Sequence, residues 1–188
     1  MNELHLQFLA SPRWAKMLET DLLPWILASG DLGDDVLEIG PGPGLTTDLL
    51  RTRVPHLTAL ELDDHLASRL TERLAGTNVD VVRADATDSG LPGEQFTTAT
   101  CFSMLHHMPT PQAQDLLFAE VHRVLRPGGQ FVGVDALDND AMRAGHQDDT
   151  FVPVDPDTLE SRLAAAGFTS TEIDVGDYQF RFRASKGR

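Results

Sequence analysis

The chain has 188 residues, which is the length of one domain able to bury its own hydrophobic core. Its formal net charge of −14 at pH 7 disfavours nucleic acids and anionic membranes as partners, because both repel an acidic surface. The single cysteine, Cys101, excludes an internal disulfide, and without a membrane-spanning run or signal peptide we expect a cytoplasmic protein.

The first predicted element is an N-terminal helix. Ser11 suits its capping position, Pro12 suits its first turn, and apolar residues follow at helical spacing. Trp14, on the apolar face, is expected either in the core or beside a cationic ligand. We predict that residues 1–30 form a helical lid over a domain at 31–188, which would fold without the lid.

Seven short runs of apolar and β-branched residues alternate with helical patterns along the rest of the chain. This alternation predicts βαβ units and a parallel sheet. A tight turn at Gly176-Asp177 joins the last two runs, which makes that pair antiparallel. We therefore predict an α/β fold with a doubly wound, seven-stranded, mostly parallel sheet and one antiparallel edge strand. The predicted strands are 36–39, 57–62, 79–83, 96–102, 130–134, 169–175 and 178–184.

Capping residues mark where the intervening helices begin. Asp63 or its neighbour, Thr110 and Asp155 each precede a helical pattern, and prolines follow the last two. The helix that follows Thr110 carries several apolar residues, Leu116 and Leu117 among them. Residues 136–154 have no clear periodicity, so we predict a loop over the edge of the sheet where ligands bind in such folds.

A glycine-rich loop follows the first predicted strand. Gly40, Gly42 and Gly44 form a G-x-G-x-G pattern, which allows the backbone to approach a ligand closely. Glu61, at the end of the second strand, can accept hydrogen bonds from two ribose hydroxyls, so a nucleoside site is predicted. The spacing differs from the G-x-G-x-x-G of dinucleotide enzymes. The acid Glu38 beside the loop also favours a cationic ligand over a pyrophosphate.

The chain resembles the class I S-adenosylmethionine-dependent methyltransferases in five motifs that occur in the family's order. Val36–Gly44 is similar to the first motif, Leu60–Asp63 to the second and Val82–Ala86 to the third. Phe102–Met108 is similar to the segment after the fourth strand in the small-molecule branch, and Val124–Gly129 to the turn into the fifth strand. The resemblance implies a Rossmann-like methyltransferase fold with S-adenosylmethionine as cofactor.

The resemblance also implies roles for residues at the strand ends. It places Glu61 at the ribose, Asp85 near the adenine and Glu38 toward the amino-acid part of the cofactor. The residues predicted to bind the cofactor are Glu38, Gly40, Gly42, Gly44, Glu61, Leu62, Asp85, Ala86 and Phe102.

Three residues are predicted to take part in acid–base chemistry at the acceptor. His106 follows the fourth strand, near the expected methyl group, and imidazole titrates near neutral pH. Asp135 ends the fifth strand, and His146 lies in the loop that follows. A second possibility is Mg²⁺, held by Asp135 and one of its neighbours at 138–140. The alternative for this loop is a solvated acidic segment.

The predicted function is methyl transfer from S-adenosylmethionine to a small-molecule acceptor, with a hydroxyl oxygen favoured. The acidic-Pro-Pro-aromatic motif of methyltransferases that act on nucleic acids and amides is absent at residues 101–104, where Cys-Phe-Ser-Met stands instead. The identity of the acceptor and the oligomeric state are left open. The alternatives are an NAD-type oxidoreductase and a non-catalytic protein that binds S-adenosylmethionine.

Overall fold

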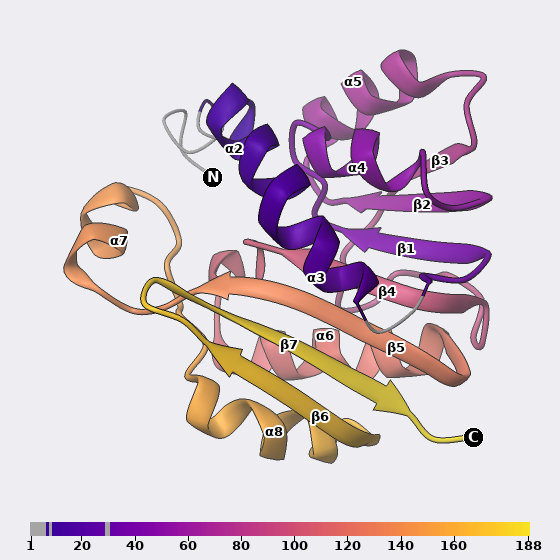
Figure 1. The fold of residues 1–188 in the computed structure, drawn as a ribbon. Coiled ribbons are helices and arrows are strands. Elements are labelled where there is room, and N and C mark those ends of the chain that lie inside the picture. Colours follow the sequence, from indigo (N-terminus) through magenta and orange to yellow (C-terminus); the bar gives the residue numbers. More distant parts are fainter. Residues whose placement is uncertain (1–6, 8, 29–30) are drawn as a thin grey trace.

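A computed structural model describes residues 7, 9–28 and 31–188. One seven-stranded sheet forms its centre, in the order β3-β2-β1-β4-β5-β7-β6, with helices on both faces (Figure 1). The predicted doubly wound α/β fold is therefore confirmed. The strands are β1 (Asp35–Ile39), β2 (His56–Glu61), β3 (Val79–Arg83), β4 (Phe96–Phe102), β5 (Leu125–Ala136), β6 (Phe168–Val175) and β7 (Gln179–Lys186).

The strand order reverses next to β1. The chain runs from β1 outward to β2 and β3, then returns to place β4 on the other side of β1. At such a reversal the connections diverge and leave a crevice at the carboxyl ends of the strands. The loop after β1 opens into this crevice, which positions the candidate site.

The strand β7 is the one that runs in the reverse direction. It pairs antiparallel with β5 on one side and with β6 on the other, so β6 occupies the edge of the sheet. The backbone N–H of Gly176 donates to the carbonyl of Gln179 at 2.9 Å and closes the predicted turn between them.

The helices cover two separate hydrophobic clusters, one on each face of the sheet. Apolar residues of α6 and α8 belong to one cluster, and those of the N-terminal helical segment and α5 belong to the other. Among the described residues, no helix is both long and apolar enough to cross a membrane. The helices are α2 (Pro12–Met17), η1 (Leu18–Leu22), α3 (Leu23–Leu27), α4 (Leu45–Leu50), α5 (Asp64–Leu74), η2 (Leu105–His107), α6 (Pro111–Val124), α7 (Asp140–Gly145) and α8 (Pro156–Ala165).

The predicted capping residues begin these helices. Asp63 accepts from the N–H of Leu66 at 2.9 Å, and Thr110 accepts from the N–H of Ala113 at 3.1 Å. Each such bond satisfies a backbone donor that the first turn leaves without a helical partner. Local chemistry therefore fixes these starting points without help from the rest of the fold.

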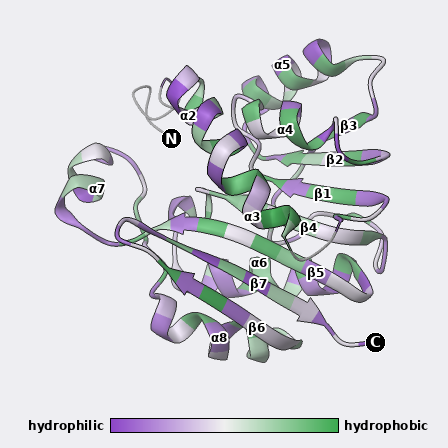
Figure 2. Ribbon diagram, in the orientation of Figure 1, coloured by the Kyte–Doolittle hydropathy of each residue, from purple (hydrophilic) through white to green (hydrophobic). Residues whose placement is uncertain are grey.

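The N-terminal segment α2–η1–α3 is part of the core. Its apolar side chains, among them Leu18 (1% exposed) and Ile26 (2% exposed), pack in the same cluster as Val36 of β1. Figure 2 shows hydrophobic residues concentrated on α3. This packing argues against the expectation that the sheet domain folds without residues 1–28. Residues 29 and 30, where the lid was predicted to end, lie outside the described part of the chain.

Two local predictions are wrong. Residues 136–154 contain the helix α7, because the side chain of Asn139 caps it by accepting from the N–H of Met142 at 3.0 Å. β5 begins at Leu125 rather than at residue 130, after a register irregularity opposite β4.

Candidate functional site

The glycine loop forms the floor of the crevice at the end of β1. Gly40, Gly42 and Gly44 have φ angles of +67°, +56° and +86°, a region that side chains other than glycine adopt at a cost. A Cβ atom on Gly42 would meet no atom within 4 Å, so open space lies above this point of the loop. A Cβ atom on Gly40 would instead meet Met104, and one on Gly44 would meet Leu70 and Arg73, so the loop leaves space beside Gly42 alone of the three.

Glu61 joins the end of β2 to the glycine loop. One oxygen of its carboxylate accepts from the N–H of Gly42 at 3.0 Å, and the other accepts from the N–H of Asp63 at 2.9 Å. The side chain is only 7% exposed and is therefore held in place at the rim of the crevice. A carboxylate has further lone pairs on each oxygen, so it retains acceptor capacity for hydroxyl groups of a ligand.

The remaining predicted cofactor residues lie along the same edge of the sheet. The N–H of Ala84 donates to the carbonyl of Glu61 at 3.2 Å, which brings the turn at Asp85 and Ala86 next to Glu61. The carboxylate of Asp85 accepts from both the N–H and the hydroxyl of Thr87 at 2.8 Å, so it shapes this turn. Leu62 is 65% exposed beside it.

A cleft at the end of β1 and β4 connects the loop to the N-terminal segment. Glu38, Gly40 and Phe102 line it from the sheet side, and Leu9 and Trp14 line it from the opposite side. Trp14 is 5% exposed and belongs to the hydrophobic core as well. The core position of Trp14 is therefore confirmed, whereas its role beside a cationic ligand stays a prediction.

Glu38 is a buried acid at the base of this cleft. Its side chain is 2% exposed, and burial raises its pKa from 4.5 to about 8, with the hydroxyl of Thr47 opposing the rise. The neighbouring Asp48 and Glu61 raise the pKa further, while Arg73 lowers it. A cation bound beside Glu38 would favour the ionised carboxylate, because opposite charges attract strongly in a site of low polarity.

Replacing Glu38 with glutamine is expected to stabilise the empty protein at pH 7.5 by on the order of 2 kcal/mol, and hardly at pH 4.5. The folded acid has the higher pKa and therefore binds more protons than the unfolded chain between pH 4.5 and about 8. Unfolding free energy of the wild type thus falls as the pH rises through this window, whereas glutamine stays neutral. Urea denaturation at both pH values measures the difference. The exposed Glu160→Gln serves as control, and a difference independent of pH would contradict the expectation.

A second cavity, of about 630 Å³, lies beside the cleft. The two share Leu9, Trp14 and Ser103 in their walls, so they adjoin one another. The second cavity continues to His106 and to the turn between β6 and β7. The cleft itself has a volume of only about 20 Å³ in this structure, because the N-terminal segment packs over the glycine loop.

The three predicted acid–base residues lie close together, and one of them, His106, lines this cavity. Asp135, at the end of β5, accepts a hydrogen bond from Nδ1 of His106 and a second from the backbone N–H of His106 at 3.2 Å. His106 and Asp135 are each 1% exposed. The ring of His146 lies edge-on to that of His106, with centroids 5.0 Å apart.

His107, the neighbour of His106 that was not selected as the base from the sequence, also belongs to this group. Its ring centroid lies 4.3 Å from that of His106 and 5.2 Å from that of His146. Its position directly after His106 in the sequence was the available signal. In the fold, η2 places both rings next to His146.

The predicted oxygen site for Mg²⁺ does not assemble among the described residues of this loop. The oxygens of Asp135 accept hydrogen bonds from His106 and from the N–H of Ala136 at 2.6 Å. Asp138 forms an ion pair with Arg143, and Asn139 caps α7. The carboxylates therefore serve the protein's own structure, while nitrogen ligands gather at the cavity.

The sheet order, the glycine loop and the acid at the end of β2 define a Rossmann-like domain with a nucleoside crevice. A family described as methyltransferase domain matches residues 37–133, slightly more than half of the chain. The chain belongs to this family of S-adenosylmethionine-dependent methyltransferases. The dinucleotide-dependent oxidoreductase considered as an alternative is thereby set aside.

Individual relatives agree with this assignment. A ubiquinone biosynthesis O-methyltransferase of Pseudomonas aeruginosa is 31% identical over 106 residues, which cover 54% of this chain and 44% of that protein. A ribosomal RNA small subunit methyltransferase A of Acidobacterium capsulatum is 45% identical over 76 residues, which cover 37% of this chain and 27% of that protein. The chain thus matches less than half the length of either relative.

The fold also agrees with solved structures. A SAM-dependent methyltransferase from Aquifex aeolicus superposes with a TM-score of 0.75 at 18% identity, and the match covers 98% of both chains. At this level of identity the likeness concerns the fold. It includes the N-terminal and C-terminal parts that lie outside the family match.

Proposed function

We propose that this protein transfers a methyl group from S-adenosylmethionine to a hydroxyl oxygen of a small molecule. The observation that carries the proposal is the pair of adjoining cavities, one over the glycine loop and one reaching His106. A methyl group presented from the first cavity would point across the shared wall of Trp14 and Ser103 toward the second. Cofactor and acceptor would then meet without a covalent enzyme intermediate.

The residues around the cleft suit the parts of S-adenosylmethionine. The carboxylate of Glu61 would accept from the ribose hydroxyls, and Asp85 and Ala86 would lie at the adenine. Phe102 and the glycines would line the cofactor, and Glu38 would face its cationic amino-acid end. The burial of Glu38 supports placing the cationic end of the cofactor beside it, because an adjacent positive charge favours the ionised form of a buried carboxyl group.

The reaction would be a direct displacement at the methyl carbon. A lone pair of the acceptor oxygen forms the O–C bond while the C–S bond breaks, and its electron pair stays on sulfur as S-adenosylhomocysteine leaves. The hydroxyl proton would pass to water on the side of the cavity that His106 lines. The protein would contribute alignment of the two reactants, and the N-terminal segment that packs over the cleft would exclude water.

A small acceptor is favoured over RNA, although relatives with both kinds of name occur. The net charge of −14 would repel a polyanion from most directions of approach. The second cavity, at about 630 Å³, has the size of a site for a small molecule. The O-methyltransferase named among the relatives supports oxygen as the acceptor atom.

The test is a product screen with purified protein, S-adenosylmethionine carrying a deuterated methyl group, and a panel of phenols, alcohols and carboxylic acids. Mass spectrometry should find the deuterated methyl on an oxygen of at least one class, with S-adenosylhomocysteine formed in equal amount. Ribosomal RNA and protein-free cell extract are run in parallel. Cofactor binding without methylation in any sample would indicate the non-catalytic alternative, and methylated RNA would contradict the choice of acceptor.

A further inference from the structure

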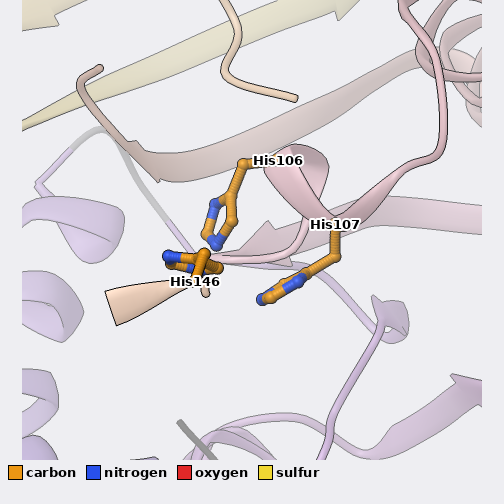
Figure 3. A group of neighbouring side chains, drawn as sticks. All are labelled: His106, His107 and His146. Atoms are coloured by element: carbon orange, nitrogen blue, oxygen red, sulfur yellow. The ribbon is translucent and has the colours of Figure 1, made fainter. Parts of the chain in front are cut away.

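We propose that His106, His107 and His146 bind a divalent transition-metal ion, with Zn²⁺ the best match. One ligand nitrogen from each histidine lies within 4.8 Å of the others. Figure 3 shows the ring of His106 directed toward that of His146, with His107 beside them. The metal site stands on this geometry alone, whereas the role given to the metal below rests on the proposed function.

The spacing of the three nitrogens is close to that of a metal centre. Tetrahedral Zn²⁺ with bonds of about 2.0–2.1 Å holds its ligand nitrogens about 3.3 Å apart. Rotations of the side chains that move each nitrogen inward by about 1 Å would bring the group from within 4.8 Å to that spacing. The cluster is therefore nearly preformed.

In two of the rings, a hydrogen bond to Nδ1 leaves Nε2 as the nitrogen that can bind a metal ion. Nδ1 of His106 bonds to the carboxylate of Asp135, and Nδ1 of His146 bonds to the carbonyl of Met142 at 2.7 Å. Carboxylate and carbonyl oxygens only accept, so both Nδ1 atoms carry hydrogen. In the neutral rings the basic nitrogen is then Nε2. Histidine ligands in metal centres are oriented in this same way, by a carboxylate or carbonyl on the other nitrogen.

The backbone around the histidines is fixed from two sides. The N–H of Val152 donates to the carbonyl of His106 at 2.8 Å, which ties the loop after α7 to η2. The side-chain amide of Gln114 donates to Leu105 at 3.1 Å and to Val152 at 2.8 Å, and thereby clamps the same two segments. A site held in this way loses little conformational entropy when an ion enters.

The donor set selects the kind of ion and leaves a position open. Three imidazoles suit Zn²⁺, Co²⁺ or Ni²⁺, whereas Mg²⁺ prefers oxygen ligands. Catalytic zinc centres have three protein ligands and one exchangeable position. Because His106 lines the second cavity, that position would face the acceptor. A hydroxyl bound there would lose its proton to water more readily and supply the electron pair for methyl transfer.

Packing of aromatic rings is the competing explanation for the cluster. Phe151 lies 4.6 Å from His146 and 5.6 Å from His106 between ring centroids, distances typical of ring contacts. A packing cluster has no affinity for metal, so a binding measurement separates the two explanations.

The experiment measures metal binding by the full chain without cofactor or acceptor. Protein dialysed against chelator is titrated with Zn²⁺ in competition with a chromogenic chelator, and Co²⁺ is added separately to record its visible spectrum. We expect one site with a Kd below about 1 µM and Co²⁺ bands of a four-coordinate centre. Asp135→Asn should weaken binding by about 10–100-fold, and His146→Ala and His107→Ala by more.

The matched control is His56→Ala. His56 lies between Asp35 and Asp80, at 2.8 and 3.0 Å, near the opposite end of the sheet, and could itself attract added Zn²⁺. Zn²⁺ binding that survives removal of all three clustered histidines, or that depends on His56, would overturn the proposal, as would a Kd weaker than about 100 µM. Thermal unfolding and S-adenosylhomocysteine binding are recorded for every variant. Metal binding without methyl transfer would overturn only the proposed function.

Discussion

Replacing His106 with alanine is expected to lower turnover of the methyl acceptor by about 10²–10⁴-fold, the range typical for losing proton-transfer assistance. The dissociation constant for S-adenosylmethionine should change by less than about twofold, because a group that shares no contacts with the cofactor cleft acts nearly independently of it. His106 lines the acceptor cavity and is absent from the lining of the cofactor cleft. Steady-state kinetics with the identified acceptor and calorimetry with the cofactor measure the two effects.

The control must account for burial, since His106 is 1% exposed and its removal leaves space around Asp135. His106→Gln retains a polar side chain of similar size but has no imidazole, so it should lose turnover as alanine does while unfolding at a higher temperature. His65→Ala, on the exposed face of α5, should match the wild type in every measurement. Equal turnover of wild type and both His106 variants would show that alignment alone drives the reaction.

Replacing Glu61 with alanine is expected to weaken S-adenosylmethionine binding by roughly tenfold to a hundredfold, or about 1.5–3 kcal/mol. The substitution removes charge-assisted hydrogen bonds to the ribose. It also removes the acceptor that holds the N–H of Gly42 at 3.0 Å, so the glycine loop loses an anchor. Isothermal titration with S-adenosylmethionine and S-adenosylhomocysteine measures both dissociation constants.

The two contributions of Glu61 can be separated. Glu61→Gln keeps one carbonyl oxygen that can accept from Gly42 but has no charge, so its affinity should fall between those of wild type and Glu61→Ala. Glu160→Ala, exposed on α8, is the control for removal of a glutamate. An unchanged dissociation constant in folded Glu61→Ala would remove Glu61 from the cofactor site.

Much of the fold could be predicted because its signals are local. Helix starts depend on a capping side chain and a backbone donor three residues away, as at Asp63 and Thr110. Parallel strands follow from alternation with helices, and the glycine loop from its own spacing. The predicted cofactor residues could be brought to one edge of the sheet for the same reason, since they lie at or near the ends of strands whose places were already implied.

The acceptor side of the site depends on contacts between distant residues, and here prediction fell short. Asp135 and His106 are 29 positions apart, and only the pairing of β4 with β5 places them together. The Mg²⁺ hypothesis treated Asp135 as a surface ligand, whereas the fold buries it against an imidazole. Likewise α7 arises from the capping side chain of Asn139 in a segment without apolar periodicity.

The N-terminal segment also affects how the chain folds as it is made. A guanidinium N–H of Arg183 on β7 donates to the carbonyl of Ile26 at 3.0 Å, across 157 positions of sequence. At a synthesis rate of about 5–20 residues per second, α3 leaves the ribosome roughly 10–30 s before this partner exists. Its apolar face can pack earlier against Val36 of β1, whereas the bond to Arg183 can form only after β7 emerges. The position of α3 is thus completed in two steps that are separated by most of the synthesis of the domain.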